Sequence, residues 1–485
     1  MHKQKRPLRS AALLVVLVIA NSVSAAPPVA IEHVNVLPMT VPGAQLSDMT
    51  VVIQDGRIRQ LEPSSTTRVP ADAQRLDGSG KWLMPSLSDM HVHVENERLV
   101  RLVARAFMGG DRLRAVSFDT ADVSLPYVAA GVLQIQNMSA MSEDVGRRIE
   151  IESGRVLGPH MALAAMVDGD PPIWPLGMTR IATSPEAGRQ VVRDIQAEGY
   201  DFVKTYSRLD AATFQAIVAE AAQRKLKVLG HIPERGKGKI AQLLQPGFAM
   251  VAHAEEFAYQ SQAMSDADIE EFVALARRNG TWLLSTLRTN EIIADQARRP
   301  EILVGRSEYD RVHPALSYIW THANPYTRAA PPERLAMLDR VVDFNRRLVR
   351  AFVAAGIPIL PGTDTIIPGM VPGVALHEEL VCLVAAGMST EQALTAATRL
   401  SAEWLNAVAD RGTVEVGKRA DLLLLEADPR ADIRNTQRIA AVVAGGRYLA
   451  RTELDVMLAT LVSRYRSMPA PYAPAAKASA GESGR

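Results

Sequence analysis

The chain has 485 residues and a formal net charge of +1 at pH 7, from 54 lysines and arginines and 53 aspartates and glutamates. This balance lacks the basic surplus of a nucleic-acid-binding protein, so we expect no nucleic-acid partner. The single cysteine, Cys382, excludes an intramolecular disulfide, and its apolar neighbours predict a packed thiol. The length suits one large α/β barrel with an appended smaller unit.

Residues 1–25 have the pattern of a secretory signal peptide. Basic residues between Lys3 and Arg9 precede an apolar run at 11–20, and small residues follow up to Ala25. The apolar run is shorter than the roughly 20 residues that a membrane span needs. We therefore predict cleavage after Ala25 and a periplasmic or secreted product without a stable membrane span. An uncleaved anchor is the alternative.

Two β-rich segments flank the middle of the chain. Residues 26–84 show alternating apolar and polar positions, with turn signals at Pro42-Gly43 and Asp55-Gly56. A similar pattern returns at residues 410–450. We expect the two segments to form one small β-sandwich subdomain from both chain ends.

Between residues 85 and 409, short apolar runs alternate with helical stretches, which indicates parallel βα units with right-handed crossovers. The runs number eight and predict an α/β fold, a (β/α)8 barrel of the TIM type. They lie at residues 91–94, 131–138, 160–166, 201–206, 226–231, 248–253, 281–287 and 357–364. We expect a helical insertion over the pocket at about 290–347, and a terminal helix with a disordered tail at 451–485.

Six residues at or near the ends of predicted strands suggest a metal site: His91, His93, Lys204, His231, His253 and Asp364. His91 and His93 project to one face because side chains alternate along a strand. Barrel enzymes place their chemistry at the C-terminal ends of the strands, and imidazole and carboxylate suit Zn2+ and similar ions. Taken singly, each residue has a structural explanation as a core, capping or ion-paired residue. Together they predict a catalytic metal centre.

The order and contexts of these six residues resemble the amidohydrolase superfamily of metal-dependent hydrolases. The motifs are SLSDMHVHV, YDFVKTYS, VLGHIP, MVAHAEE and ILPGTDT, and the resemblance runs from about Val29 to Tyr448. It implies two divalent metal ions, Zn2+ or a similar ion. His91, His93 and Asp364 would hold the more buried ion, and His231 and His253 the second.

The resemblance also implies that Lys204 reacts with CO2 to form a carbamate that bridges the metals. A protonated lysine cannot bind a cation, so a lysine at this strand end favours a binuclear site. Asp364 is expected to act as general base and then general acid.

Two further residues are candidates for substrate binding. Tyr206 lies two positions after Lys204, faces the same interior and is expected to stabilise the oxyanion, with barrel packing as its alternative role. Arg288 follows the seventh predicted strand and is expected to bind a substrate carboxylate, with surface solvation as its alternative role.

The resemblance is strongest to exported imidazolonepropionase-like and Xaa-Pro dipeptidase-like hydrolases with a carboxylated lysine. It predicts that a metal-bridging hydroxide cleaves an amide or peptide C–N bond in a small substrate, a dipeptide or an N-acyl amino acid. A mononuclear cyclic-amide hydrolase or deaminase is the first alternative, favoured by the H-x-x-E spacing of His231 and Glu234. An exported metal-binding protein with a degenerate site is the second. A homo-oligomer is left open.

Overall fold

The computed structural model describes residues 27–108, 113–114, 116–234, 238–303, 305–328 and 330–472. The predicted signal peptide and residues 473–485 of the predicted tail lie outside the described residues. Within the described part of the chain, no helix combines the length and the apolar character that crossing a membrane requires.

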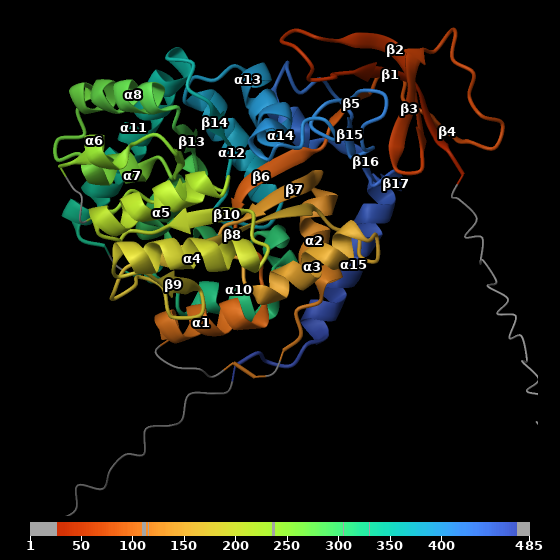
Figure 1. The fold of residues 1–485 in the computed structure, drawn as a ribbon. Helices are drawn as coiled ribbons and strands as arrows, with labels where there is room; N and C mark the ends of the chain where they lie inside the picture. Colours follow the sequence, from red (N-terminus) through yellow and green to blue (C-terminus); the bar gives the residue numbers. More distant parts are fainter. Residues whose placement is uncertain are drawn as a thin grey trace, which may run out of the picture.

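Eight parallel strands form a barrel in the middle of the molecule (Figure 1). In sheet order they are β6 (Leu87–Val92), β7 (Val132–Asn137), β8 (His160–Asp168), β10 (Phe202–Thr205), β11 (Lys227–Gly230), β12 (Phe248–Ala252), β13 (Trp282–Leu284) and β14 (Ile359–Leu360). A parallel bridge between Val92 and Thr365 brings the first and last strands together. The predicted (β/α)8 fold is confirmed. A short strand, β9 (Thr179–Ile181), pairs with β8 and was not predicted.

Helices surround the barrel on its outside (Figure 1). They are α1 (Glu97–Met108), α2 (Thr120–Ala129), α3 (Ser142–Glu152), α4 (Pro185–Ala197), α5 (Ala211–Gln223), α6 (Ile240–Leu243), α7 (Glu255–Gln260), α8 (Asp266–Asn279), α12 (Val374–Ala385), α13 (Thr390–Thr395) and α14 (Ser401–Trp404). Several begin at a capping side chain that accepts a hydrogen bond from a backbone N–H of the first turn, as Ser184, Asp210 and Ser265 do. Local sequence therefore determines where these helices start.

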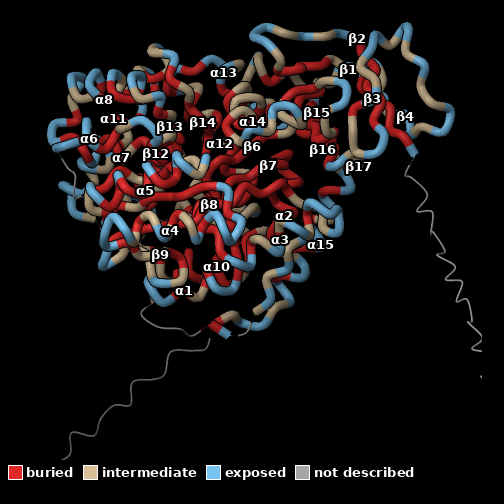
Figure 2. Tube along the Cα trace, viewed as in Figure 1, coloured by how far each residue is buried: buried red, intermediate tan, exposed pale blue. Residues whose placement is uncertain are grey.

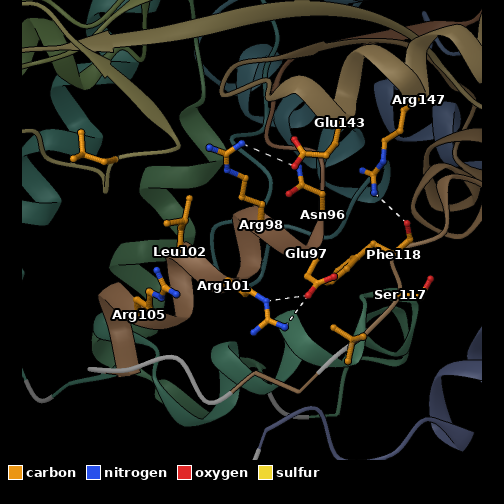
Figure 3. A pocket seen from close by; sticks show the side chains of 12 residues that line it. Asn96, Glu97, Arg98, Arg101, Leu102, Arg105, Ser117, Phe118, Glu143 and Arg147 are labelled. Carbon is orange, nitrogen blue, oxygen red and sulfur yellow. Dashed lines mark hydrogen bonds and ion pairs between the residues drawn. The ribbon is translucent and has the colours of Figure 1, made fainter.

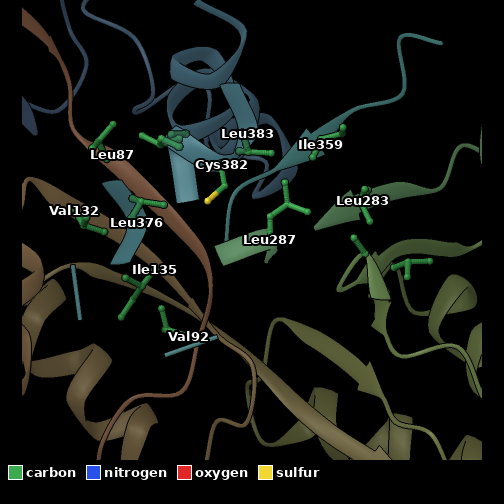
Figure 4. Packing of buried hydrophobic residues seen from close by; sticks show 14 of the residues in the cluster. Leu87, Val92, Val132, Ile135, Leu283, Leu287, Ile359, Leu376, Cys382 and Leu383 are labelled. Carbon is green, nitrogen blue, oxygen red and sulfur yellow. The ribbon is translucent and has the colours of Figure 1, made fainter. Parts of the chain in front are cut away.

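Apolar side chains are buried on both faces of the barrel strands, and the buried core lies under a more exposed helical layer (Figure 2). On the outer face, Leu87 and Val132 pack in one cluster with Leu376 and Cys382 of α12 (Figure 4). Cys382 is a buried free thiol, as predicted, and burial raises its pKa. The barrel interior is filled by a separate cluster: Met90, Met138, Ala162, Ala164, Phe202, Leu229, Met250, Ala252, Leu284, Leu360 and Trp404.

A second sheet joins strands from both chain ends, as expected. Its order is β17 (Arg447–Ala450), β16 (Ile439–Ala444), β15 (Leu422–Leu425), β5 (Trp82–Pro85), β1 (Val29–Val36), β2 (Leu46–Gln54) and β3 (Arg57–Pro63), with β4 (Gln74–Asp77) beside β1. The two halves meet where β15 pairs antiparallel with β5, with Leu424 opposite Leu83. All eight strands are hydrogen-bonded in one sheet, which has its own apolar core.

The long segment between β13 and β14 is helical. It contains α9 (Leu287–Arg298), α10 (Pro314–His322) and α11 (Pro332–Ala354), with short 3-10 turns at η2 (Pro300–Leu303), η3 (Ser307–Arg311) and η4 (Pro325–Thr327). After the second sheet, α15 (Arg451–Ser467) runs back along the barrel beside α2 (Figure 1).

His160 links the barrel to the second sheet at the N-terminal end of β8. Its Nδ1 lies 2.8 Å from Glu152 of α3, and its Nε2 lies 2.9 Å from Asp421, directly before β15. Burial disfavours the imidazolium, but hydrogen bonds to the two carboxylates outweigh burial and raise the pKa of His160 above 6.5.

His160→Gln is expected to lower the free energy of unfolding by about 1–3 kcal/mol at pH 6 and by less at pH 9. The folded-state pKa of His160 is raised. Its stabilising contribution is therefore complete below the unfolded pKa and is lost as the pH rises through the folded pKa. Denaturant unfolding of both proteins at the two pH values measures the difference. A loss of equal size at both would assign the effect to packing rather than charge.

Candidate metal centre

The structure brings all six predicted ligand residues to the C-terminal end of the barrel. His91 lies near the end of β6 and His93 directly follows this strand, whereas Lys204 lies within β10. His231 and His253 each follow the last residue of their strands, β11 and β12, and Asp364 follows β14. Parallel strands end on one side of a barrel, so residues far apart in sequence meet there.

Asp364 is at the centre of the first group of donors. Its Oδ1 lies 3.3 Å from His91 Nε2 and 3.0 Å from His93 Nε2. One ligand atom from each of these three residues lies within 4.8 Å of the others. Two imidazoles and a carboxylate at this separation match the donors of a divalent metal site.

The remaining candidates adjoin this group. Lys204 Nζ lies 3.3 Å from His91 Nε2. The ring centroid of His253 is 4.4 Å from that of His91 and 5.0 Å from that of His231. The second histidine pair is therefore close enough to the first group to hold a neighbouring ion.

Protein groups fix one nitrogen of three of these histidines. His93 Nδ1 lies 2.6 Å from Ser139 Oγ, and His253 Nδ1 lies 3.0 Å from Thr286 Oγ1. His231 Nδ1 has two partners, Ser207 Oγ at 2.9 Å and Glu256 Oε1 at 3.0 Å. Such bonds orient a metal-ligating imidazole and leave Nε2 for the ion. His231 Nε2 is buried with no hydrogen-bond partner among the described residues, which fits the role of a metal ligand.

The backbone around the centre adopts unusual conformations. Three residues after strand ends have positive φ: His253 at 78°, Thr286 at 47° and Asp364 at 51°. Strain of this kind is concentrated at functional sites. Gly230, at φ 135°, lies against the backbone of Thr205, where a Cβ would come within 2.2 Å of the carbonyl oxygen. A side chain at Gly230 would displace the adjacent His231.

Burial sets the charges of the centre. It lowers the pKa of Lys204 to about 8, despite the opposing effects of Asp364 and Glu256, and lowers the pKa of His91 to about 3. His91 is therefore neutral at pH 7, the form that binds metals. Lys204 remains mostly protonated at this pH, but its neutral amine, the form that reacts with CO2, is far more populated than in an ordinary lysine. Burial opposes the charge of Asp364, but the histidines hold its pKa well below 3.8, so it is a carboxylate.

A cavity of 370 Å³ opens directly onto the centre. Its inner end includes Lys204, His231 and Asp364. Its sides carry apolar residues, among them Val103, Phe107, Trp174, Met178 and Ile366, and polar residues, among them Tyr206, Glu255, Asn290, Tyr326 and Arg334. This volume matches pockets for small molecules, with apolar walls and a few polar groups.

Tyr206 lines the cavity in a fixed orientation. Its ring stacks on His231 at a centroid distance of 3.9 Å. Trp174 Nε1 donates a 2.7 Å hydrogen bond to its hydroxyl oxygen. The Tyr206 hydroxyl can still donate its own proton to a ligand.

The prediction that Arg288 binds a substrate carboxylate in the cavity requires a correction. Arg288 is not among the described residues that line the cavity. Its Nε donates to Glu378 at 2.9 Å, and its Nη1 lies 3.7 Å from Asp295. The chain turns at Thr286 into α9, which directs Arg288 toward α12 instead of the cavity. Glu234, whose H-x-x-E spacing from His231 favoured the mononuclear alternative, is exposed and pairs with Arg208 at 3.5 Å. It also lies outside the described lining of the cavity.

Two acidic residues of the site were not predicted. Glu256 accepts a 2.9 Å hydrogen bond from the amide of Ile232, in addition to its contact with His231. Glu255 lines the cavity and accepts a 2.7 Å hydrogen bond from Asn290 Nδ2, and burial raises its pKa to about 8. Both residues follow His253 closely in the sequence, and this position beside a strand-end histidine is the signal that could have identified them.

A larger cavity of 680 Å³ lies beside α1, away from the metal centre. Figure 3 shows interactions of three of its arginines: Arg98 faces Glu143, Arg101 binds Glu97, and Arg147 donates to the carbonyl of Phe118. It contains none of the six candidate ligands, so its size does not make it the reactive site.

The barrel and the convergent donors define a metal-dependent hydrolase of the (β/α)8 class. Residues 82–449 match the Amidohydrolase family, and the chain belongs to this family. It is therefore a hydrolase that acts on C–N bonds with the help of metal.

Similar proteins span nearly the whole chain. Imidazolonepropionase of Caulobacter vibrioides is 24% identical over 419 residues, covering 81% of this chain and 92% of that protein. A structure described as a prolidase of Bifidobacterium longum is 26% identical, has a TM-score of 0.64 and covers 90% of this chain and 99% of its own. Bottromycin amidohydrolase shares the fold, with 19% identity, a TM-score of 0.68 and 90% coverage of each chain.

Proposed function

We propose that the protein hydrolyses the amide or peptide C–N bond of a small substrate, a dipeptide or an N-acyl amino acid. It would use two divalent ions, Zn2+ or a similar ion, and a carbamate on Lys204. The supporting observation is the position of Lys204, which is 1% exposed and has its amine 3.3 Å from His91 Nε2. An ammonium there would repel cations, whereas a carbamate would supply two oxygens that share one negative charge.

The donor set divides into two groups. His91, His93 and Asp364 would hold one ion, and His231 and His253 the other, with the Lys204 carbamate between them. Divalent ions bound there would polarise the substrate carbonyl and make water acidic enough to react near neutral pH.

The chain's own residues would then move protons and bind the substrate. Asp364, a carboxylate at neutral pH, would accept a proton from the attacking water and pass it to the leaving nitrogen. Tyr206 would donate a hydrogen bond to the carbonyl oxygen as negative charge develops there. Trp174 would hold the phenol in place through its indole N–H.

Tyr206→Phe is expected to lower kcat about 10²-fold while changing KM little, because the lost hydrogen bond strengthens in the transition state. Steady-state kinetics of an N-acyl amino acid measure the effect. Tyr259→Phe is the matched control, since Tyr259 lines the same cavity but is 49% exposed. Equal effects of the two substitutions would remove Tyr206 from the oxyanion role.

A mononuclear cyclic-amide hydrolase is the second candidate, favoured by the similarity to imidazolonepropionase. Metal-loaded protein should be screened against dipeptides, N-acyl amino acids, cyclic amides and lactones. Turnover of the first two classes supports the proposal. Exclusive turnover of cyclic amides or lactones would contradict it and favour the second candidate.

We also propose that the protein is exported, with cleavage after Ala25. The support is the basic and apolar pattern of residues 1–25. Sequencing the N-terminus of protein recovered from the periplasm or medium tests this, and a retained residue 1 in that fraction would contradict cleavage.

A further inference from the structure

Arg334 lines the cavity of the metal centre from the segment between β13 and β14. It lies in the first turn of α11, and Leu338, one turn further along, lines the same cavity. Arg334 is exposed, whereas Lys204 is buried at the inner end. Among the described residues that line the cavity, Lys204 and Arg334 are the only lysine or arginine residues.

Intramolecular contacts do not account for this arginine. Neighbouring arginines of the same segment are paired, Arg306 with Glu378 at 2.7 Å and Arg346 with Glu291 at 2.5 Å. Across the described ranges of the chain, the Arg334 guanidinium has no ion pair and no hydrogen bond. A cation in the first turn of a helix is also disfavoured by the helix dipole. Its charge is therefore available to a ligand.

Tyr326 of η4 lines the same cavity as Arg334 and the metal-site residue Asp364. Burial raises the pKa of Tyr326, and the charges of Asp364 and Arg334 act on its phenol in opposite directions. Tyr326 thus lies within electrostatic range of both groups.

We propose that Arg334 binds the free carboxylate of the leaving amino acid and so determines the preference for substrates with a free C-terminus. This inference rests on the proposed function and assigns the residue that recognises the leaving amino acid. A guanidinium binds a carboxylate through two parallel hydrogen bonds. In the reaction the C–N bond breaks, water gives its oxygen to the acyl carbon and a proton to nitrogen, and the carboxylate is unchanged. The apolar side of the cavity favours an apolar side chain.

The test compares N-acetyl-L-leucine with its C-terminal amide, following acetate release by wild-type and Arg334→Met enzymes. The substitution is expected to lower kcat/KM about tenfold for the acid, mostly through KM, and to leave the amide unchanged. Arg334→Lys should recover part of the loss, because an ammonium binds as a point charge. Arg340→Met is the control on the same helix, since Arg340 contacts the Ala263 carbonyl and does not line the cavity.

Two results would overturn the inference: equal losses for the acid and the amide, or no loss for either. If wild-type enzyme cleaves neither substrate, the substrate screen described above decides on the proposed function separately. Calorimetric binding of N-acetyl-L-leucine then still tests Arg334. Binding that is lost in Arg334→Met but kept in Arg340→Met supports the carboxylate site, and binding that is absent or unaffected contradicts it.

Discussion

Lys204→Ala is expected to lose hydrolytic activity by at least about 10³-fold and to bind fewer metal ions than the wild type. Lys204 is buried among the histidine ligands, so its removal would delete the bridging anion and leave two cations to repel each other. Steady-state kinetics and elemental analysis of the purified variant measure both effects.

A control separates this role from general damage to the barrel. Lys227 lies on the neighbouring strand β11 at the opposite end, where its amine lies over the ring of Trp404. Lys227→Ala should therefore keep its metal content. Formate, acetate or propionate should restore part of the activity of Lys204→Ala by occupying the vacated space. A Lys204→Ala enzyme with full metal content and normal turnover would contradict the carbamate.

Asp364→Asn is expected to keep the fold and part of the metal but to lower kcat by about 10³- to 10⁴-fold, because an amide cannot accept the proton. In the wild type, the pKa of Asp364 is held well below 3.8, so the base form persists above acidic pH and activity should fall only as the pH drops. The pKa values of that acidic limb belong to Asp364 and the reacting water as a pair.

A pH–rate profile of wild type and variant measures this effect. If Asp364→Asn stays within about tenfold of the wild type, the base is a different residue. Glu255 is then the next candidate, because it lines the cavity whereas Glu234 does not. An unchanged acidic limb in the variant would also exclude Asp364.

Short apolar runs predicted the barrel well because each parallel strand is covered on both faces and therefore reads as apolar in sequence. The convergence of His91, Lys204 and His253 at one end of the barrel could be predicted for a related reason. The topology of a barrel brings strand ends together, so chemistry at the end of a strand is informative even without coordinates.

Other features depend on tertiary packing that a local pattern does not contain. Arg288 follows a strand, but the turn at Thr286 directs it to Glu378. Arg334 reaches the cavity from a long helical segment whose path over the barrel depends on distant contacts. The role of Glu256 depends on its contact with His231, which comes from a different strand.

Titration of metal-free protein with Zn2+ in the presence of bicarbonate tests the proposed binuclear centre most directly. Hydrolysis of an N-acyl amino acid should rise with added metal and reach its maximum at two ions per chain, with elemental analysis giving the same ratio. Full activity at one ion per chain, with no further binding, would contradict the carbamate-bridged centre.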